Sequence, residues 1–150
     1  MVKIQFQIEG FGKDELATFA AMREGETPVE PERLWGAVEF SDESGVTVLI
    51  KENLLSIAED LFETVPLMLE QHGRAELQLK SWPGQFSFEP SALRDQIRVT
   101  GPVKGSAKIN GVFLKDELIA QLQACGERFA DFVKQLNLKK AESNLLMQDC

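Results

Sequence analysis

The amino-acid sequence predicts an α+β fold in which an antiparallel sheet carries two long helices packed on one face. Two patterns predict this class: short segments in which apolar and polar residues alternate, and two longer segments in which apolar residues recur at helical spacing. The chain has 150 residues, enough to bury a core without help from a disulfide or a metal. We expect a single α+β domain over residues 1–138 and a carboxyl-terminal tail over residues 139–150.

The first third of the chain predicts a strand, a segment that is either helix or strand, a loop and a hairpin. Apolar residues occupy every second position over residues 2–8, which is typical of a strand with one buried face. Residues 13–22 fit either a short helix or a second strand, and residues 24–32, rich in glycine and proline, predict a loop. Residues 35–40 and 46–51 predict a hairpin whose turn is formed by the polar residues between them.

The first long helix is predicted over residues 53–71, where the apolar residues fall on one stripe at helical spacing. Pro66 lies inside this segment, and because proline lacks a backbone donor and clashes with the preceding turn, we expect a kink or break there. Gly73 is the expected carboxyl-terminal cap.

The second half predicts four short strands, a turn and another helix. The strands are expected over four alternating segments: 75–80, 85–89, 96–100 and 107–113. The turn Trp82-Pro83-Gly84 separates the first two of them. The second helix is predicted over about residues 116–136 from its apolar stripe, which includes Cys125 as a small buried hydrophobe.

Two stretches of the sequence resemble each other. Residues 48–55 match residues 112–119 at an offset of 64, and each stretch passes from a predicted strand directly into a predicted helix. The chain therefore reads as two halves, about 1–73 and 74–138, each with strands followed by one helix. Either the halves arose by duplication, or strand-to-helix junctions simply use similar residues.

The charges are distributed unevenly along the chain. The net charge is −8, but residues 1–71 hold 5 basic against 15 acidic side chains, whereas residues 72–150 hold 11 basic against 9 acidic ones. A half so poor in lysine and arginine projects a negative potential, which repels nucleic acids and anionic membranes and attracts basic proteins. The other interpretation is that the acidity only keeps the protein in solution.

The candidate partner-binding residues are the acidic side chains of the predicted loop, the hairpin turn and the first helix, together with one tryptophan. They are Glu24, Glu26, Glu30, Glu32, Asp42, Glu43, Glu59, Asp60, Glu63 and Trp82. On the first helix, Glu52 and Glu70 extend the acidic face, and no lysine or arginine lies among them. A like-charge pair one turn apart, such as Glu59 and Glu63, destabilises a helix by about 0.3 kcal/mol, so folding gains nothing from it. Trp82 is either a lid over the core or an exposed anchor for a partner.

No catalytic signature occurs in the sequence. Gly10-Phe11-Gly12 lacks the third glycine of a dinucleotide-binding fingerprint, and no phosphate-binding loop or CxxC pair is present. The only histidine, His72, is expected to complement the carboxyl end of the first helix. We therefore expect no catalytic residue, no cofactor and no metal site. Two cysteines, Cys125 and Cys150, and the lack of a signal or membrane-spanning segment favour a reducing cytoplasm.

Three features resemble small acidic bacterial immunity proteins: the strand over residues 35–40 (WGAVEF), the strand-to-helix junction over residues 48–55, and the acidic segments. The resemblance implies a non-enzymatic inhibitor that binds a basic toxin, such as a nuclease, and occludes it. An adaptor, chaperone or assembly subunit acting through a sheet edge or a homodimer interface is the alternative, and an enzyme with paired carboxylates is a third. The sequence leaves the oligomeric state open.

Overall fold

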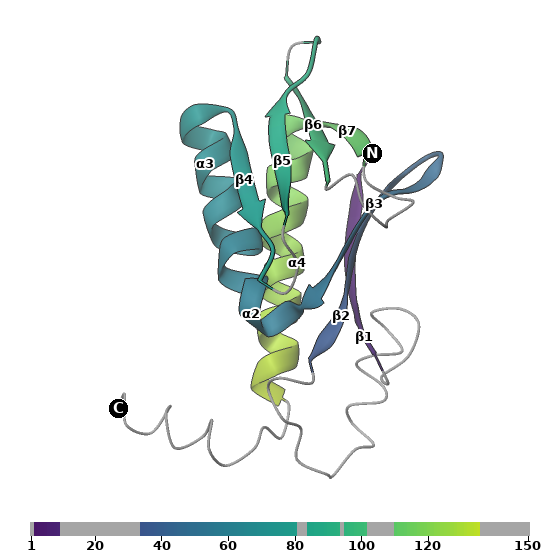
Figure 1. The fold of residues 1–150 in the computed structure, drawn as a ribbon, viewed down its shortest axis with the longest axis vertical. Coiled ribbons are helices and arrows are strands. Elements are labelled where there is room, and N and C mark those ends of the chain that lie inside the picture. The colour runs from purple at the N-terminus through teal and green to yellow at the C-terminus, as the bar shows by residue number, and fades with distance from the viewer. Residues whose placement is uncertain (1, 10–33, 81–83, 94, 102–109, 136–150) are drawn as a thin grey trace.

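The structure, a computed structural model, describes residues 2–9, 34–80, 84–93, 95–101 and 110–135 (Figure 1). The α+β class is confirmed, but the strands within these residues form two antiparallel sheets instead of the single sheet that the sequence predicts. The segments 13–22 and 24–32, the turn residues Trp82 and Pro83, and the tail 139–150 lie outside the described residues. The domain limits of 1–138 and 139–150 therefore stay a prediction.

The first sheet has the order β1-β2-β3, with β1 (Lys3–Ile8), β2 (Trp35–Asp42) and β3 (Gly45–Asn53). Both neighbouring pairs are antiparallel, and the register shifts between Phe40 and Ser41. The alternating residues of β1 are buried on one face, as predicted. The predicted hairpin is also confirmed, with a tight turn between β2 and β3.

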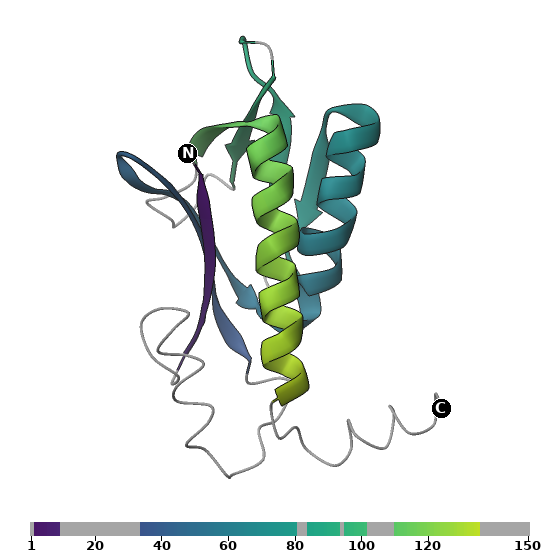
Figure 2. The same ribbon diagram turned by 180° about the vertical axis from the view of Figure 1, so that it is seen from behind.

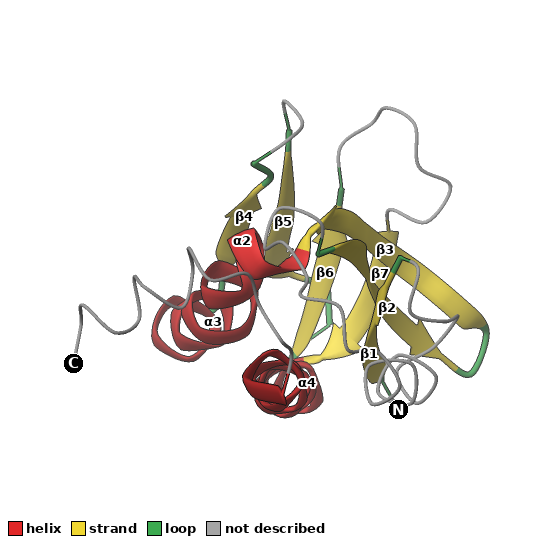
Figure 3. Cartoon of the chain, turned by 90° about the horizontal axis from the view of Figure 1, so that it is seen from below, coloured by secondary structure: helices red, strands yellow, loops and turns green. Residues whose placement is uncertain are grey.

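The second sheet is a meander of β4 (Ala75–Gln78), β5 (Gln85–Pro90), β6 (Gln96–Thr100) and β7 (Asn110–Leu114). Its last strand lies against β3 of the first sheet, which Figure 3 shows from below. A Cβ atom at Gly111 of β7 would lie 2.6 Å from the hydroxyl oxygen of Thr47 on β3, so only glycine allows this approach.

The first predicted helix is present but consists of three segments: α2 (Leu54–Glu59), the π-helical turn η2 (Asp60–Thr64) and α3 (Val65–His72). The side chain of Asn53 caps its start by accepting a hydrogen bond from the Ser56 N–H, and Gly73 ends it in the left-handed conformation, as predicted.

Pro66 does not break the helix. The irregularity lies just before it, where the Val65 N–H donates to the Asp60 carbonyl five residues back. A proline removes one donor and crowds the preceding turn of an α-helix. A wider π turn at this place relieves that crowding while the chain continues as a helix.

The second helix, α4 (Lys115–Gln135), follows β7 directly, just as α2 follows β3. Within the described residues, each half of the chain therefore contains an antiparallel meander that runs straight into a helix. This shared order agrees with the repeat seen in the sequence, and a common origin of the halves stays a prediction.

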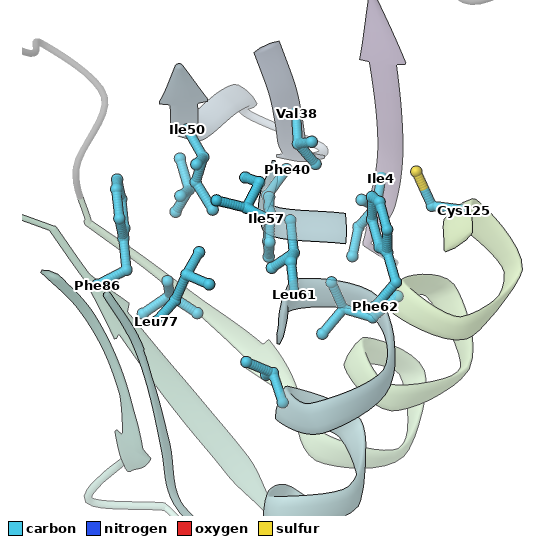
Figure 4. Packing of buried hydrophobic residues seen from close by; sticks show 14 of the residues in the cluster. Ile4, Val38, Phe40, Ile50, Ile57, Leu61, Phe62, Leu77, Phe86 and Cys125 are labelled. Atoms are coloured by element: carbon cyan, nitrogen blue, oxygen red, sulfur yellow. The ribbon is translucent and has the colours of Figure 1, made fainter. Parts of the chain in front are cut away.

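Both helices share one apolar core with the two sheets (Figure 4). Figure 2 shows α4 between β1 on one side and α3 on the other, and α3 in turn contacts β4. Aromatic contacts hold α4 against the first sheet. The ring centroid of Phe6 lies 5.3 Å from that of Phe129, in an edge-to-face arrangement, and 5.6 Å from that of Phe132. Cys125 is buried in this core, as predicted.

The helices of the two halves lie in close contact at Gly126 of α4 and Phe62 of η2. A Cβ atom at Gly126 would lie 2.5 Å from the Cβ atom of Phe62, which is too close for two carbons. Since the Cβ atom of Phe62 is bonded directly to its backbone, it cannot move aside unless η2 itself shifts. The lack of a side chain at Gly126 therefore sets the distance between the helices.

We predict that Gly126→Ala destabilises the protein by about 1 kcal/mol net. Overpacking a core contact costs about 1 to 3 kcal/mol, and the gain in helix propensity returns about 1 kcal/mol of it. Urea unfolding measures the difference. Ala120→Gly, at an exposed position on the same helix, calibrates the propensity alone. A stabilised Gly126→Ala protein would show that the two helices do not meet as described.

Candidate protein-binding surface

The ten candidate residues fall into three groups in the structure. Five of them lie outside the described residues: Glu24, Glu26, Glu30, Glu32 and Trp82. Asp42 and Glu43 lie at the turn between β2 and β3, whereas Glu59, Asp60 and Glu63 lie on the first helix. The described candidates thus occupy two separate places.

The hairpin turn and the first helix are at opposite ends of the first sheet (Figure 1). Asp42 pairs with Gly45 at one end of the β2–β3 ladder, and Trp35 pairs with Asn53 at the other, next to the start of α2. At the rise of a β-strand, the length of β2 corresponds to about 23 Å. The structure therefore does not join the two groups into one continuous acidic surface.

At the hairpin turn, Asp42 has a local structural role. Its carboxylate accepts hydrogen bonds from the Ser44 hydroxyl at 2.6 Å and from the Ser44 N–H at 2.8 Å. These two bonds stabilise the charged form and lower the pKa of the Asp42 carboxyl below its ordinary value. Such aspartate turns are a common way to satisfy the backbone where a chain reverses.

Glu52 does not belong to the acidic outer face, which corrects the prediction from the sequence. It is the one charged side chain that is fully buried among the described residues, with 0% of its surface exposed. One carboxylate oxygen accepts from the Lys80 N–H at 2.8 Å and the other from the Asn53 N–H at 3.0 Å. The carboxylate thus connects the end of β3 to the chain just after β4, which lies in the second half.

Lys80 also compensates one of the candidate residues. Its ammonium group lies 3.3 Å from the Asp60 carboxylate, and both side chains are partly exposed. No lysine or arginine lies among the acidic residues of the first helix, but Asp60 has a cationic partner from the second half of the chain. In the described part of the chain, by contrast, neither Glu59 nor Glu63 has an ion-pair partner, and both side chains are exposed.

Next to Glu59 and Glu63, a groove of about 1000 Å³ runs between the first helix and α4. We call it the interhelical groove; it is lined by Leu55, Ala58, Glu59, Phe62, Glu63, Leu67, Glu70, Gln123, Gly126, Glu127, Phe129, Ala130, Val133 and Lys134. Its floor contains the buried rings of Phe62 and Phe129, while Leu67 is half exposed at 50%. An apolar floor edged by charges is typical of a protein-binding surface.

The sequence contains an indication of this groove: apolar residues of the first helix that lie outside its predicted buried stripe. Leu55 and Leu67 lie beside the buried stripe of the first helix, on the side that carries Glu59 and Glu63. An apolar band wider than the core requires indicates a second contact surface. The second wall of the groove is formed by α4 residues that lie about 65 positions later in the chain. The contact between the two walls therefore could not be predicted from the sequence pattern alone.

Other kinds of site find no support in the residues that the structure describes. No group of three or more His, Cys, Asp or Glu side chains in those ranges can hold a metal ion. None of the described helices combines the length and apolar character that crossing a membrane requires. His72 is exposed at the last turn of α3, where the sequence predicted it.

No protein-family model, curated protein or solved structure matches the chain. The resemblance to immunity proteins therefore stays a prediction.

We predict that Glu52→Gln destabilises the protein by about 1 to 3 kcal/mol, because one of the two backbone donors that bond to this buried side chain loses its charged acceptor. Thermal or urea unfolding measures the loss. The control is Glu59→Gln, the same substitution at an exposed carboxylate, which should change stability by no more than about 0.5 kcal/mol. Equal effects of the two substitutions would contradict the burial of Glu52.

We also predict that the Asp42 carboxyl titrates below 3.8, the ordinary value. Because its pKa is lower in the folded than in the unfolded protein, its stabilising contribution is present above that ordinary value and is lost as the pH falls through the folded pKa. Carboxyl NMR titration should show the midpoint rise in Ser44→Ala. The control is Ser41→Ala, which removes a hydroxyl that donates to the Lys3 carbonyl and not to Asp42. An equal rise of the Asp42 midpoint in this control would contradict the assignment of the shift to Ser44.

Proposed function

We propose that the protein is a non-enzymatic, protein-binding inhibitor of the immunity type, which binds a basic toxin and occludes its working surface. One observation carries the proposal: Glu59 and Glu63 are exposed one helical turn apart, and no lysine or arginine of the described chain lies within ion-pair distance of either. Such a pair weakens its own helix slightly, and a cationic partner would reverse the sign of that effect.

The position of these residues supports the same function. Glu59, Glu63 and Glu70 line the same groove, so the negative charge borders an apolar surface instead of being scattered. Charges of this kind accelerate the encounter with an oppositely charged protein, whereas desolvated apolar contacts slow its dissociation. An inhibitor of a lethal enzyme needs both properties, since it must bind quickly and stay bound.

The overall charge favours a basic protein as the partner over a nucleic acid. At a net charge of −8, with the excess in the first half, the chain repels phosphate backbones. A nuclease presents a cationic surface to the same phosphates. An acidic protein that covers this surface would block the enzyme without any covalent step.

We predict that Glu59→Lys/Glu63→Lys slows association with the native partner by at least about tenfold, because it replaces attraction with repulsion at the contact. The partner is first captured from the host and identified by mass spectrometry. Its association rate is then measured from about 50 mM to about 500 mM NaCl, over which the wild-type rate should fall steeply as screening increases.

The matched control is Glu76→Lys/Glu89→Lys, which changes the net charge equally but on exposed positions of β4 and β5. It should retain most of the wild-type rate, because local charge at the contact outweighs total charge. If both double variants slow binding alike, or if neither does, the proposed docking surface is wrong. In the same way, lysine variants that still protect cells from the toxin at normal expression would contradict it.

A further inference from the structure

We propose that the interhelical groove receives one amphipathic helix of the partner, with apolar side chains on the groove floor and lysine or arginine side chains along the glutamates. The basic character of this helix rests on the proposed function, whereas the helical form follows from the groove itself. Helix-in-groove docking is a recurrent way in which proteins bind a helical segment.

The dimensions of the groove fit a short helix. On the first helix the lining runs from Leu55 to Glu70, and on α4 it runs from Gln123 to Lys134. At the rise of an α-helix these stretches extend for about 16 to 22 Å, which corresponds to a guest helix of about 11 to 15 residues. Three turns of helix are enough to place apolar residues at the first, fourth, eighth and eleventh positions of one face.

Small residues allow a guest to come close to the floor. Ala58 lies on one wall, and Ala130 lies on the other. Because their side chains are short, the backbone of a third helix can approach both walls, as it does in helical bundles. The half-exposed Leu67 and the partly buried Val133 then provide apolar contacts at the sides.

The charges at the sides define the polar face of the guest. Glu59, Glu63 and Glu70 follow the first helix, and Glu127 lies on α4 with Lys134 near the end of that wall. Glutamates one turn apart match basic residues one turn apart on an adjacent helix. A guest with lysine or arginine beside its apolar stripe is thus complementary in charge as well as in shape.

Charge complementarity also argues against a second copy of this chain. Two copies facing each other through this groove would bring two sets of glutamates together, and like charges across an interface oppose association. The chain after α4 carries Lys139 and Lys140 and then Leu145, Leu146 and Met147, so it is a rival occupant that the experiment must separate from a partner.

The test uses the full chain and a synthetic peptide of about 14 residues. The peptide has leucine and alanine on one face, at helical spacing, and lysine and arginine on both sides of that face. The control peptide has the same composition in an order that leaves no apolar face. Fluorescence anisotropy of the labelled peptides measures binding, and circular dichroism verifies that each protein variant is folded.

Two alanine variants on α4 decide whether the groove is the binding site. Ala130→Trp fills the groove, whereas Ala120→Trp puts the same side chain at an exposed position of the same helix, in a separate depression that meets the groove only at Glu70 and Gln123. We expect micromolar binding of the amphipathic peptide, at least about tenfold weaker in Ala130→Trp and changed less than about twofold in Ala120→Trp. The control peptide should bind at least about tenfold more weakly than the amphipathic one.

Three results would overturn the proposal. Equal binding by both tryptophan variants, or by both peptides, would mean that only charge attracts the peptide. A tenfold gain in affinity in Leu145→Ser/Leu146→Ser would identify the chain's own end as the occupant. A concentration-dependent dimer that dissociates in Ala130→Trp would identify a second copy of the chain as the occupant. None of these results depends on the captured partner. A failure of the proposed function would appear instead in the association rates with that partner, so the two failures are distinguishable.

Discussion

The contact between Phe62 and Gly126 is the constraint on which the rest of the structure depends. It joins the helices of the two halves at a distance that no side chain at position 126 would allow. Phe129, beside Phe62, then contacts Phe6 of the first sheet, so the same cluster holds α4 against β1. Because the two helices meet face to face, their outer sides form the walls of the interhelical groove, and its floor is the core itself.

The elements of the fold were predictable because their signals are local. The period-two pattern at β1 and the helical spacing at α4 each lie within one segment and need no distant partner. The division into two sheets was not predictable, because alternation shows which face of a strand is buried and not which strand lies beside it. Here β7 lies against β3 at Gly111 and Thr47, a contact that the pattern of neither strand indicates by itself.

Glu52 shows that a charged residue is assigned to the wrong face of a strand when the alternation of buried and exposed positions is ignored. It lies two residues after Ile50 and four after Val48, on the buried face of β3, and it pairs with Gly36 in the ladder. Alternation alone therefore places it in the core, whereas its acidity suggests the surface. The burial is tolerable because two backbone N–H groups bond to the carboxylate, one of them from the second half of the chain.

The acidic residues of the first half thus divide by what they already bind. Glu52 accepts hydrogen bonds from backbone N–H groups, Asp42 accepts hydrogen bonds within the hairpin turn, and Asp60 forms an ion pair with Lys80. A charge used within the fold has less to offer a partner, since binding would have to replace an existing contact. Glu59 and Glu63 have no such ion pair in the described chain, and they border exposed apolar surface. These two glutamates, and not the total charge, are therefore what a basic partner can bind, because the total includes carboxylates that already stabilise the fold.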